Sequence, residues 1–446
     1  MPASAIDSAI YRDLFYDAEV GKLFTDSAEI RAMMVVEGAL AKAQASLGLI
    51  PETAAAAIHR AGLEVQIDPA GLAAATGQNA VVVPALVSAF REAMNAPEHA
   101  AYMHWGATSQ DIMDTGLVLR LRQVLAIHHD RLTALVKALG HLADAHADQP
   151  MAGRTYGQVA TPTSFGAVVA SWGAPLIRHL DRLADLKPRL LQVSLSGAAG
   201  TLSAMGSEGP QVRAALAKAL GLGDPGASWH STRDSIAEFS GWLTLVTGTL
   251  GKIGEDLLLM TQTGIGEVTL ASGGGSSTMP QKSNPVLPSV LVALARHTNT
   301  LNGAIQGAAL HRQQRDGAAW MTEWLSLPQV ALASARALAV ADDLAQGITP
   351  NPDRMRAAID DGLGLTYAEA LSFALAGTMP RPEAQKAVKA VCAEARDSGT
   401  PLATLAARHW PETVSASLFT PEAQLGQAPA EARAFAAAAR AVPSSS

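Results

Sequence analysis

A glycine-rich segment at residues 272–285 concentrates the most reactive side chains of this sequence. It reads Ser-Gly-Gly-Gly-Ser-Ser-Thr-Met-Pro-Gln-Lys-Ser-Asn-Pro. Three successive glycines disfavour a helix, because each costs about 1 kcal/mol relative to alanine in a helix interior. Hydroxyls, a lysine and an amide follow, with prolines at positions 280 and 285. Mobile backbone beside fixed backbone suits a loop that closes over an active site.

The residues after this segment argue against a simple linker. A linker would be the ordinary interpretation of the glycines and serines alone. Here, however, an apolar stripe at helical spacing follows at once, formed by Val290, Leu294, His297, Leu301, Ile305 and Ala308. The sequence therefore predicts a functional loop that leads directly into a long helix.

Four polar segments are predicted to lie just before helices, at Thr108, Thr155, Ser231 and Ser276. The N-terminus of a helix offers free N–H groups and about half a positive charge, which favours anions. If the fold brings the four together, they form a cage for a polycarboxylate. We expect mobile positive charge for the same purpose from Arg154, Arg233, Lys282 and His311.

Two of these helix starts have local sequence signals. Thr108 and Asp111 fit a capping box that opens a helix through about residue 147. Capping alone would leave His104 and Gln110 unexplained, so the pattern favours a ligand site there. Thr161 as N-cap and Pro162 as first helical residue predict another helix to about residue 187.

Helical patterns extend along the whole chain and predict three helical domains, at residues 1–106, 107–346 and 347–446. The run at 80–94 contains three valines, but its length and its Leu86/Phe90 spacing favour a helix. Gly347 to Pro352 marks the clearest boundary. About five helices of the middle region exceed the usual length of roughly 11–12 residues. Their apolar faces are too extensive for one chain to bury, which predicts an oligomer.

Composition excludes several classes of protein. The 446 residues are 48% hydrophobic and carry a net charge of −7, whereas a nucleic-acid-binding protein would show a basic face. The N-terminus is too charged for a signal peptide, and no uninterrupted apolar run reaches the 18 residues of a membrane span. The single cysteine, Cys392, excludes an internal disulfide, and no Cys/His spacing suits zinc. We expect a soluble, cytoplasmic protein without metal or other cofactor.

The signature loop, residues 272–285, resembles that of the fumarase/aspartase superfamily, with the pattern Gly-Ser-Ser-x-Met-Pro-x-Lys-x-Asn. All fixed positions are met, by Gly275, Ser276, Ser277, Met279, Pro280, Lys282 and Asn284. The resemblance implies an all-α fold of three helical domains with a central bundle of long helices. It also implies a homotetramer whose active sites combine loops of three subunits, and a small polycarboxylate substrate.

The resemblance also implies roles for individual residues. Ser276 would transfer the proton at the carbon next to a carboxylate, and Lys282 and Asn284 would stabilise the negative charge that accumulates there. Simpler interpretations remain for two of the positions, since Ser277 could be only a helix cap and Lys282 only a surface charge. Substrate-binding roles fall on His104, Thr108, Ser109, Gln110, Arg154, Thr155, Tyr156, Gln158, Arg233, Ser277, Met279 and His311.

Departures from the pattern narrow the expected reaction. Adenylosuccinate lyases usually have a general-acid histidine where this chain has Tyr156, and a His-Asp pair where it has Gln78 and Asn79. A lyase that protonates an amine leaving group needs such an acid. A carboxylate leaving group, whose pKa is about 4, does not. The chain therefore resembles most the subgroup that closes a carboxymuconate into a lactone. A C–N lyase that releases fumarate and a catalytically silent structural homologue are the alternatives.

Overall fold

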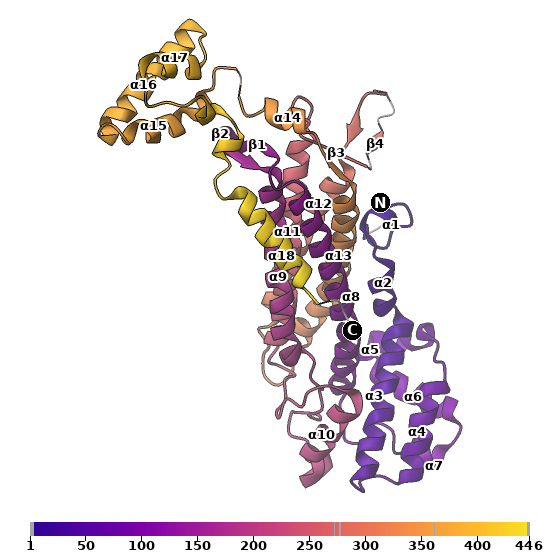
Figure 1. Cartoon of the computed structure of the whole chain (residues 1–446). Coiled ribbons are helices and arrows are strands. Elements are labelled where there is room, and N and C mark those ends of the chain that lie inside the picture. The colour runs from indigo at the N-terminus through magenta and orange to yellow at the C-terminus, as the bar shows by residue number, and fades with distance from the viewer. Residues whose placement is uncertain (1–3, 272, 276–277, 361, 444–446) are drawn as a thin grey trace. The chain divides into compact units, whose positions relative to one another are not determined.

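The structure, a computed structural model, describes residues 4–271, 273–275, 278–360 and 362–443. Helices dominate this part of the chain, and the strands within it form three sheets of two strands each (Figure 1). The predicted all-α class is confirmed. Ser276 and Ser277 of the signature loop lie outside the described residues.

Five long helices form the middle of the chain, as predicted. They are α8 (Ser109–Ala145), α9 (Phe165–Leu190), α11 (Asp234–Met260), α12 (Val286–Ala308) and α13 (Gly317–Gly347). The chain divides into two compact units, and the division falls within each of these helices. Unit 1 comprises Met1–Asp130, His179–Gly248 and Leu294–Ala337, and unit 2 comprises Arg131–Arg178, Thr249–Ala293 and Leu338–Ser446. The three-domain division of the sequence stays a prediction.

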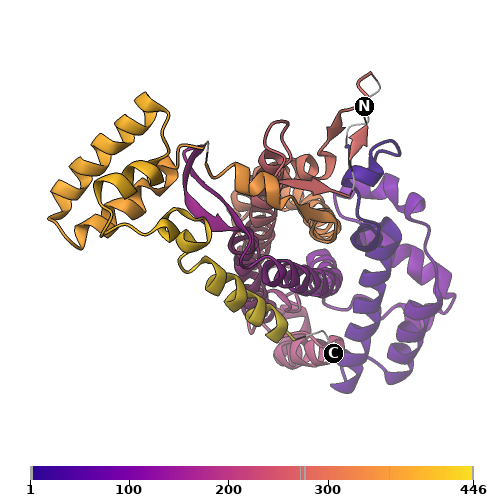
Figure 2. The same cartoon turned by 45° about the horizontal axis from the view of Figure 1, so that its top comes forward.

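Unit 1 contains the N-terminal helices, and the longer of them lie side by side around one hydrophobic core (Figures 1 and 2). The hydroxyl of Thr25 caps the first long one by accepting the N–H of Ala28 at 3.2 Å. Buried Met33, Leu40 and Phe90 belong to this core. The helix predicted at 80–94 is confirmed as Val83–Met94. The helices of this region are α1 (Arg12–Phe15), α2 (Ala18–Gly21), α3 (Asp26–Ser46), α4 (Glu52–Glu64), α5 (Ala73–Asn79), α6 (Val83–Met94), α7 (Pro97–Ala100) and, later in the chain, α10 (Gly209–Leu220).

Unit 2 contains the C-terminal helices α14 (Pro352–Ala357), α15 (Ala368–Ala376), α16 (Arg381–Ser398), α17 (Leu402–His409) and α18 (Ala428–Ala441). Helices α15 to α17 share a core of their own, to which Leu371, Val388 and Leu405 belong. Helix α18 instead packs closely against two glycines, Gly140 and Gly173. A Cβ at Gly173 would lie 2.0 Å from the ring of Phe435, and one at Gly140 would lie 2.6 Å from Ala439. Glycine at these two positions therefore permits the contact.

The three small sheets all lie in unit 2. Strand β1 (Pro150–Thr155) pairs antiparallel with β2 (Gln158–Ser164), β3 (Val268–Leu270) pairs with β6 (Ile348–Pro350), and β4 (Gly274–Gly275) pairs with β5 (Ser283–Asn284). The prediction that Thr161 and Pro162 start a helix is wrong. Both residues lie in β2, and α9 begins only at Phe165, because the segment pairs with β1 instead.

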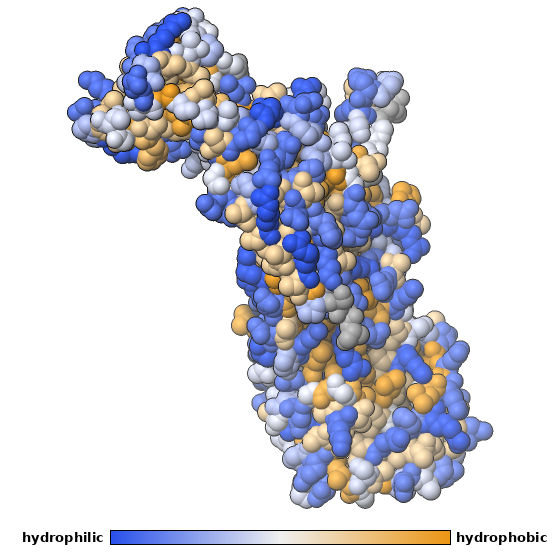
Figure 3. Space-filling view, viewed as in Figure 1, coloured by the Kyte–Doolittle hydropathy of each residue, from blue (hydrophilic) through white to orange (hydrophobic). Residues whose placement is uncertain are grey.

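Six short 3₁₀ turns complete the described elements, at Lys22–Phe24, Pro69–Leu72, Ser203–Glu208, Leu365–Tyr367, Ala416–Phe419 and Glu422–Gln424. Helix α13 is long and apolar enough to cross a membrane by length and composition, but 67% of its apolar window is buried inside the structure. Such burial is typical of a core helix. Large hydrophobic side chains are exposed on α11 (Leu245, Leu259) and α13 (Leu325). In the space-filling view, hydrophobic residues lie interspersed among hydrophilic ones (Figure 3).

Candidate functional site

The start of α8 in unit 1 carries a buried carboxylate, Asp111, that joins three segments of the chain. Its two oxygens accept the backbone N–H groups of Thr108 at 2.9 Å, Ser196 at 2.8 Å and Gly197 at 3.0 Å. Nε2 of His230 lies 2.8 Å from Oδ1. The bond to Thr108 is the half of the predicted capping box that the acidic residue supplies. Asp111 is therefore fully engaged and positions the loop around Thr108.

Gln110 beside it connects this loop to an arginine. Its amide nitrogen donates to Asp114 Oδ2 at 3.1 Å and to the carbonyl of His230 at 2.9 Å. Its amide oxygen accepts Nε–H of Arg315 at 2.7 Å. Arg315 also reaches Thr108 Oγ1 at 3.5 Å, and its side chain is exposed. We call Thr108, Gln110, Asp111, His230 and Arg315 the Thr108 cluster.

Arg315 is a candidate that the residue pattern did not single out, since positive charge was expected from Arg154, Arg233, Lys282 and His311. Its place in a polar run just before a helix, followed by an aspartate, was the available signal. What the sequence could not give was the contact, since Arg315 and Gln110 are 205 positions apart. Arg315 places an exposed guanidinium beside the hydroxyl of Thr108, as a carboxylate-binding site requires.

Arg233 differs from that prediction, because its guanidinium is fixed and fully buried. It donates to Glu323 at 2.8 and 2.6 Å and to Asp114 at 2.7 and 3.1 Å. Burial alone would lower the pKa of Arg233, but the charges of Asp114 and Glu323 raise it well above its usual range. Burial raises the pKa of Glu323, and this effect outweighs the hydrogen bond from Arg233, which lowers it. We call these three residues the acid–arginine network.

His311 also lies inside the structure, where we had expected a mobile charge. Its side chain is fully buried, and neither ring nitrogen has a hydrogen-bond partner among the described residues. Nε2 lies 4.0 Å from Oε1 of Glu323. Burial, followed by the positive charge of Arg233, lowers the pKa of His311. His311 is therefore held in its neutral form at pH 7.

His104 and Ser109 complete the predicted residues of unit 1. Nδ1 of His104 lies 2.6 Å from Oε1 of buried Glu37, and its backbone adopts a positive φ of 62°. Burial alone would lower the pKa of His104, but the hydrogen bond and the charge of Glu37 outweigh it, so the pKa is raised. Ser109 is the first residue of α8 and is half-buried.

The predicted residues of unit 2 lie on two hairpins. Arg154, in β1, donates to both oxygens of buried Glu267, at 3.0 and 2.8 Å, so this arginine is also fixed. Thr155 and Gln158 pair at the end of the β1–β2 hairpin. Between them, Tyr156 and Gly157 form the tip with φ values of 53° and 74°. The Tyr156 side chain is completely exposed.

This hairpin corrects the expectation that Thr155 precedes a helix. The free N–H groups of a helix start are ten residues away, at Phe165. An anion at Thr155 would therefore have to be bound by side chains and by the hairpin backbone. The helix start predicted after Thr108 is confirmed, because Ser109 opens α8. An anion site there stays a prediction.

The described parts of the signature loop pair as two short strands, also in unit 2. Gly274 pairs with Asn284 and Gly275 with Ser283, and α12 begins at Val286. A Cβ at Gly274 would lie 2.6 Å from the side chain of Val286, so glycine permits the close approach of the strands to the helix. Met279 and Lys282 are exposed, and the backbone N–H of Lys282 donates to the carbonyl of Met279 at 3.0 Å.

The described site residues thus form two sets, one in each unit. Unit 1 brings together Thr108, Gln110, Arg233 and His311 through the contacts above. Unit 2 holds Arg154, Thr155, Tyr156 and Gln158 on one hairpin and Met279, Lys282 and Asn284 on another. Among the described residues no group of three or more His, Cys, Asp or Glu side chains suits a metal ion.

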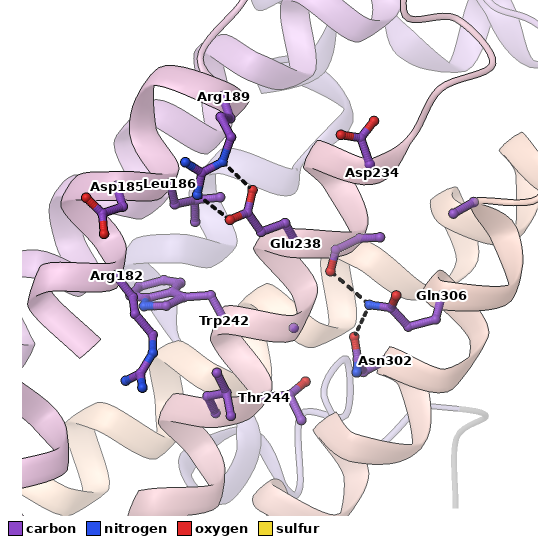
Figure 4. Close-up of a pocket in the computed structure, with 14 residues that line it drawn as sticks. Arg182, Asp185, Leu186, Arg189, Asp234, Glu238, Trp242, Thr244, Asn302 and Gln306 are labelled. Carbon is purple, nitrogen blue, oxygen red and sulfur yellow. Dashed lines mark hydrogen bonds and ion pairs between the residues drawn. The ribbon is translucent and has the colours of Figure 1, made fainter. Parts of the chain in front are cut away.

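A large pocket of unit 1, of about 780 Å³, lies away from these residues, between α9, α11 and α12 (Figure 4). None of the predicted site residues that the structure describes lines it. Arg189 on its wall pairs with both oxygens of Glu238, and Gln306 donates to Asn302 at 3.1 Å. These four side chains therefore satisfy one another in two pairs.

Comparisons with known proteins found a matching family profile, related proteins and similar solved structures. A sequence profile described as a lyase matches residues 17–298. A 3-carboxy-cis,cis-muconate cycloisomerase of Pseudomonas aeruginosa is 41% identical over 386 residues, which is 85% of this chain and 84% of that protein. The crystal structure of a 3-carboxy-cis,cis-muconate lactonizing enzyme from Pseudomonas putida superimposes with a TM-score of 0.92 at 35% identity, covering 97% and 99% of the two chains. A fumarate lyase structure from Mesorhizobium sp. BNC1 gives 0.89 at 36% identity, covering 95% and 98%.

Proposed function

Because this chain belongs to the lyase family, within the fumarase/aspartase superfamily, we propose that it converts 3-carboxy-cis,cis-muconate to 4-carboxymuconolactone. The observation that carries the proposal is the similarity to a cycloisomerase of that substrate over most of both chains. The substrate would be a small polycarboxylate from the degradation of protocatechuate, in the β-ketoadipate pathway. The chain would work without a cofactor, a nucleic acid or a membrane.

The reaction is an internal addition. One carboxylate oxygen of the muconate attacks an alkene carbon and forms the C–O bond of the lactone. The displaced electron pair moves onto the neighbouring carboxylate, giving an aci-carboxylate dianion, and a proton then adds to the carbon next to that carboxylate. The difficult part is to stabilise the dianion, for which fixed hydrogen-bond donors and cations are the general solution.

The residues divide this work between binding and proton transfer. The hydroxyls of Thr108 and Ser109 and the guanidinium of Arg315 would bind a carboxylate at the start of α8, where N–H groups favour an anion. His104, Thr155, Gln158 and Met279 would contact the rest of the substrate. In the signature loop, Lys282 and Asn284 would hold the dianion and Ser276 would deliver the proton. The role of Ser276 rests on the sequence motif, because the residue lies outside the described part.

Buried residues would act through their neighbours. Arg233 and His311 would position the Thr108 cluster, because Asp114 of the acid–arginine network also accepts the amide of Gln110. Arg154 would fix the β1–β2 hairpin through Glu267. Tyr156 would present a phenol at the tip of that hairpin, where a phenol of pKa about 10 is a weak acid. Lactone formation fits this position, since the carboxylate nucleophile needs no acid to activate it.

Three further expectations belong to the same proposal. The chain would assemble as a homotetramer whose active sites combine the Thr108 cluster and the two hairpins from different subunits. The division into domains at residues 106 and 346 and a cytoplasmic location complete it. The exposed leucines on α11 and α13 are consistent with an interface there.

The alternative function is cleavage of a C–N bond with release of fumarate. The similarity to a fumarate lyase structure favours keeping it. A silent homologue is the remaining alternative, and the retention of Lys282 and Asn284 argues against it.

A direct assay separates these possibilities. Purified protein is mixed with 3-carboxy-cis,cis-muconate, and the ultraviolet absorbance of the diene is followed. Rapid, enzyme-dependent loss of absorbance is expected. No loss, together with fumarate release from succinyl adducts such as adenylosuccinate, would replace the proposal by the C–N lyase. No reaction with either substrate would favour the silent homologue.

A further inference from the structure

A second cavity of unit 1 has the dimensions and walls of a small-ligand site. Its volume is about 250 Å³, and three aromatic side chains line it, those of Phe24, Trp320 and Trp324. The two tryptophan rings stand edge to face with their centroids 4.8 Å apart. A cavity of roughly 150 Å³ accommodates benzene in another protein. The additional space here fits one aromatic ring with a small substituent.

Arg120 supplies this cavity with a buried positive charge. The residue is 7% exposed, and its Nε has no hydrogen-bond partner among the described residues. Its NH1 lies 3.4 Å from the carbonyl of Leu23 and 3.6 Å from Oε2 of Glu29, both long distances for hydrogen bonds. Its guanidinium carbon lies 5.7 Å from the ring centre of Phe24. Arg120 lines the cavity together with Glu29 and Phe24, so its guanidinium lies at the wall.

The charge of Arg120 is incompletely neutralised. Burial lowers the pKa of Arg120, and the attraction of Glu29 does not restore it. A buried N–H without an acceptor is costly, and a ligand that supplies the acceptor removes that cost. A carboxylate can supply it, together with the missing negative charge.

Another part of the wall carries the opposite charge. Asp114 and Glu323 line the same cavity, and both are held by the single guanidinium of Arg233. Glu29 is a third carboxylate of the wall, so a single ligand carboxylate is favoured only directly on Arg120, and three carboxylates against the two guanidinium groups of Arg120 and Arg233 leave an excess of negative charge. A ligand with a second or third carboxylate would be repelled by it, since like charges close together disfavour each other strongly in a buried site.

From these observations we propose that this cavity binds a small aromatic monocarboxylate, with its carboxylate on Arg120 and its ring among Phe24, Trp320 and Trp324. The site differs in chemistry from the Thr108 cluster, for which we propose a polycarboxylate. It does not depend on which reaction the protein catalyses.

The test is calorimetric titration of the full-length protein with benzoate. One saturable site per chain is expected. Three comparison ligands separate the contributions: acetate lacks the ring, benzamide lacks the charge, and benzene-1,3,5-tricarboxylate carries two carboxylates too many. Each should bind about tenfold more weakly than benzoate or worse. Absence of saturable benzoate binding, or equal binding of the tricarboxylate, would overturn the proposal.

Two variants and one control locate the site. Arg120→Gln should weaken benzoate binding by about tenfold or more, because it removes the charge. Val82→Phe should abolish binding by filling the cavity while Arg120 remains, since Val82 also lines the wall. Arg122→Gln is the matched control: this exposed arginine of the same helix donates to the carbonyl of Leu220, and benzoate binding should not change.

The thermal midpoint of each variant shows whether it is folded, and the Val82 variant remains informative if Arg120→Gln unfolds. Unchanged benzoate binding in a folded Val82→Phe variant would place the ligand elsewhere and overturn the proposal. A second check adds saturating 3-carboxy-cis,cis-muconate or its product. Benzoate binding should persist. Displacement of benzoate would overturn the proposal, because benzoate would then occupy the reaction site. Because binding is measured without turnover, its failure is distinct from failure of the lactone assay.

Discussion

The Thr108 cluster and the signature loop contain similar polar residues but hold them in opposite ways. Around Thr108, the side chains of Asp111 and Gln110 each make several hydrogen bonds to segments distant in sequence. In the signature loop, Lys282 is exposed and its described hydrogen bond is a backbone one, to Met279. A cluster fixed by such hydrogen bonds can recognise a carboxylate without rearranging. The comparison teaches that the proposed carboxylate binding and the proposed proton transfer fall on segments whose described polar side chains are held by different contacts.

The largest effect is expected in the signature loop. Ser276→Ala should lower kcat by about a thousandfold, within the range of general acid–base catalysis, without changing the thermal midpoint. Steady-state turnover and a thermal melt measure both quantities. Retention of more than a small fraction of the activity would exclude Ser276 as the proton donor.

The acid–arginine network should show the reverse pattern, with a large effect on stability. Arg233→Gln leaves the carboxylates of Asp114 and Glu323 without their partner, and breaking a buried pair costs about 3–5 kcal/mol. Urea unfolding measures this loss. Arg189→Gln, which breaks the exposed pair with Glu238, is the control and should hardly shift the midpoint. Equal shifts for the two variants would contradict the distinction.

Arg315 tests whether the exposed member of the Thr108 cluster meets the substrate. Arg315→Ala should raise KM by about tenfold to a hundredfold, as expected for the loss of a charged hydrogen bond. The folded structure should be unaffected, because the guanidinium is exposed. Arg312→Ala is a neighbouring control, since Arg312 pairs with Asp316 in its own loop. An unchanged KM in Arg315→Ala would remove Arg315 from the site.

The pH dependence of stability tests the buried state of His311. Its pKa is lowered on folding, so the unfolded chain takes up the proton first as the pH falls below about 6.5. Stability should therefore decrease between pH 7 and pH 5, and His311→Gln should make this decrease smaller. His104, whose pKa is raised, contributes in the opposite direction. Urea midpoints at several pH values, with His409→Gln as an exposed control, measure the difference. An unchanged slope would refute the assignment.

The smallest effect is expected at the tip of the β1–β2 hairpin. Tyr156→Phe removes only the phenolic hydroxyl of an exposed side chain, and kcat should fall by no more than about threefold if no acid is required. A loss as large as that of Ser276→Ala would identify Tyr156 as an acid or base and would favour a C–N lyase.

The sequence predicted the long helices well because their signals are local. The capping residues Thr108 and Asp111 and the apolar pattern after them placed α8 within a few residues of its observed bounds. It failed where pairing is between distant segments or overrides a local signal. Thr161 and Pro162 form a good helix start on their own, yet pairing with β1 makes them a strand. The β3–β6 sheet joins residues about 80 positions apart, which no local pattern reveals.

The site followed the same rule. The helix start at Thr108 was predictable from Thr108 and Asp111, whereas the burial of Arg233 depends on partners 119 and 90 positions away. Charge alone could not tell fixed Arg233 from exposed Arg315. Their difference lies in tertiary contacts, which the residue types do not encode locally.

The most direct test of the central claim is the reaction run in deuterium oxide, with the lactone product examined by NMR. The account predicts one deuterium on the carbon next to a carboxylate, at a single stereochemical position, because one positioned group delivers it from one face. The Ser276→Ala variant should give no such product at a comparable rate. Absence of lactone, or deuterium distributed over both positions, would contradict proton delivery by the signature loop.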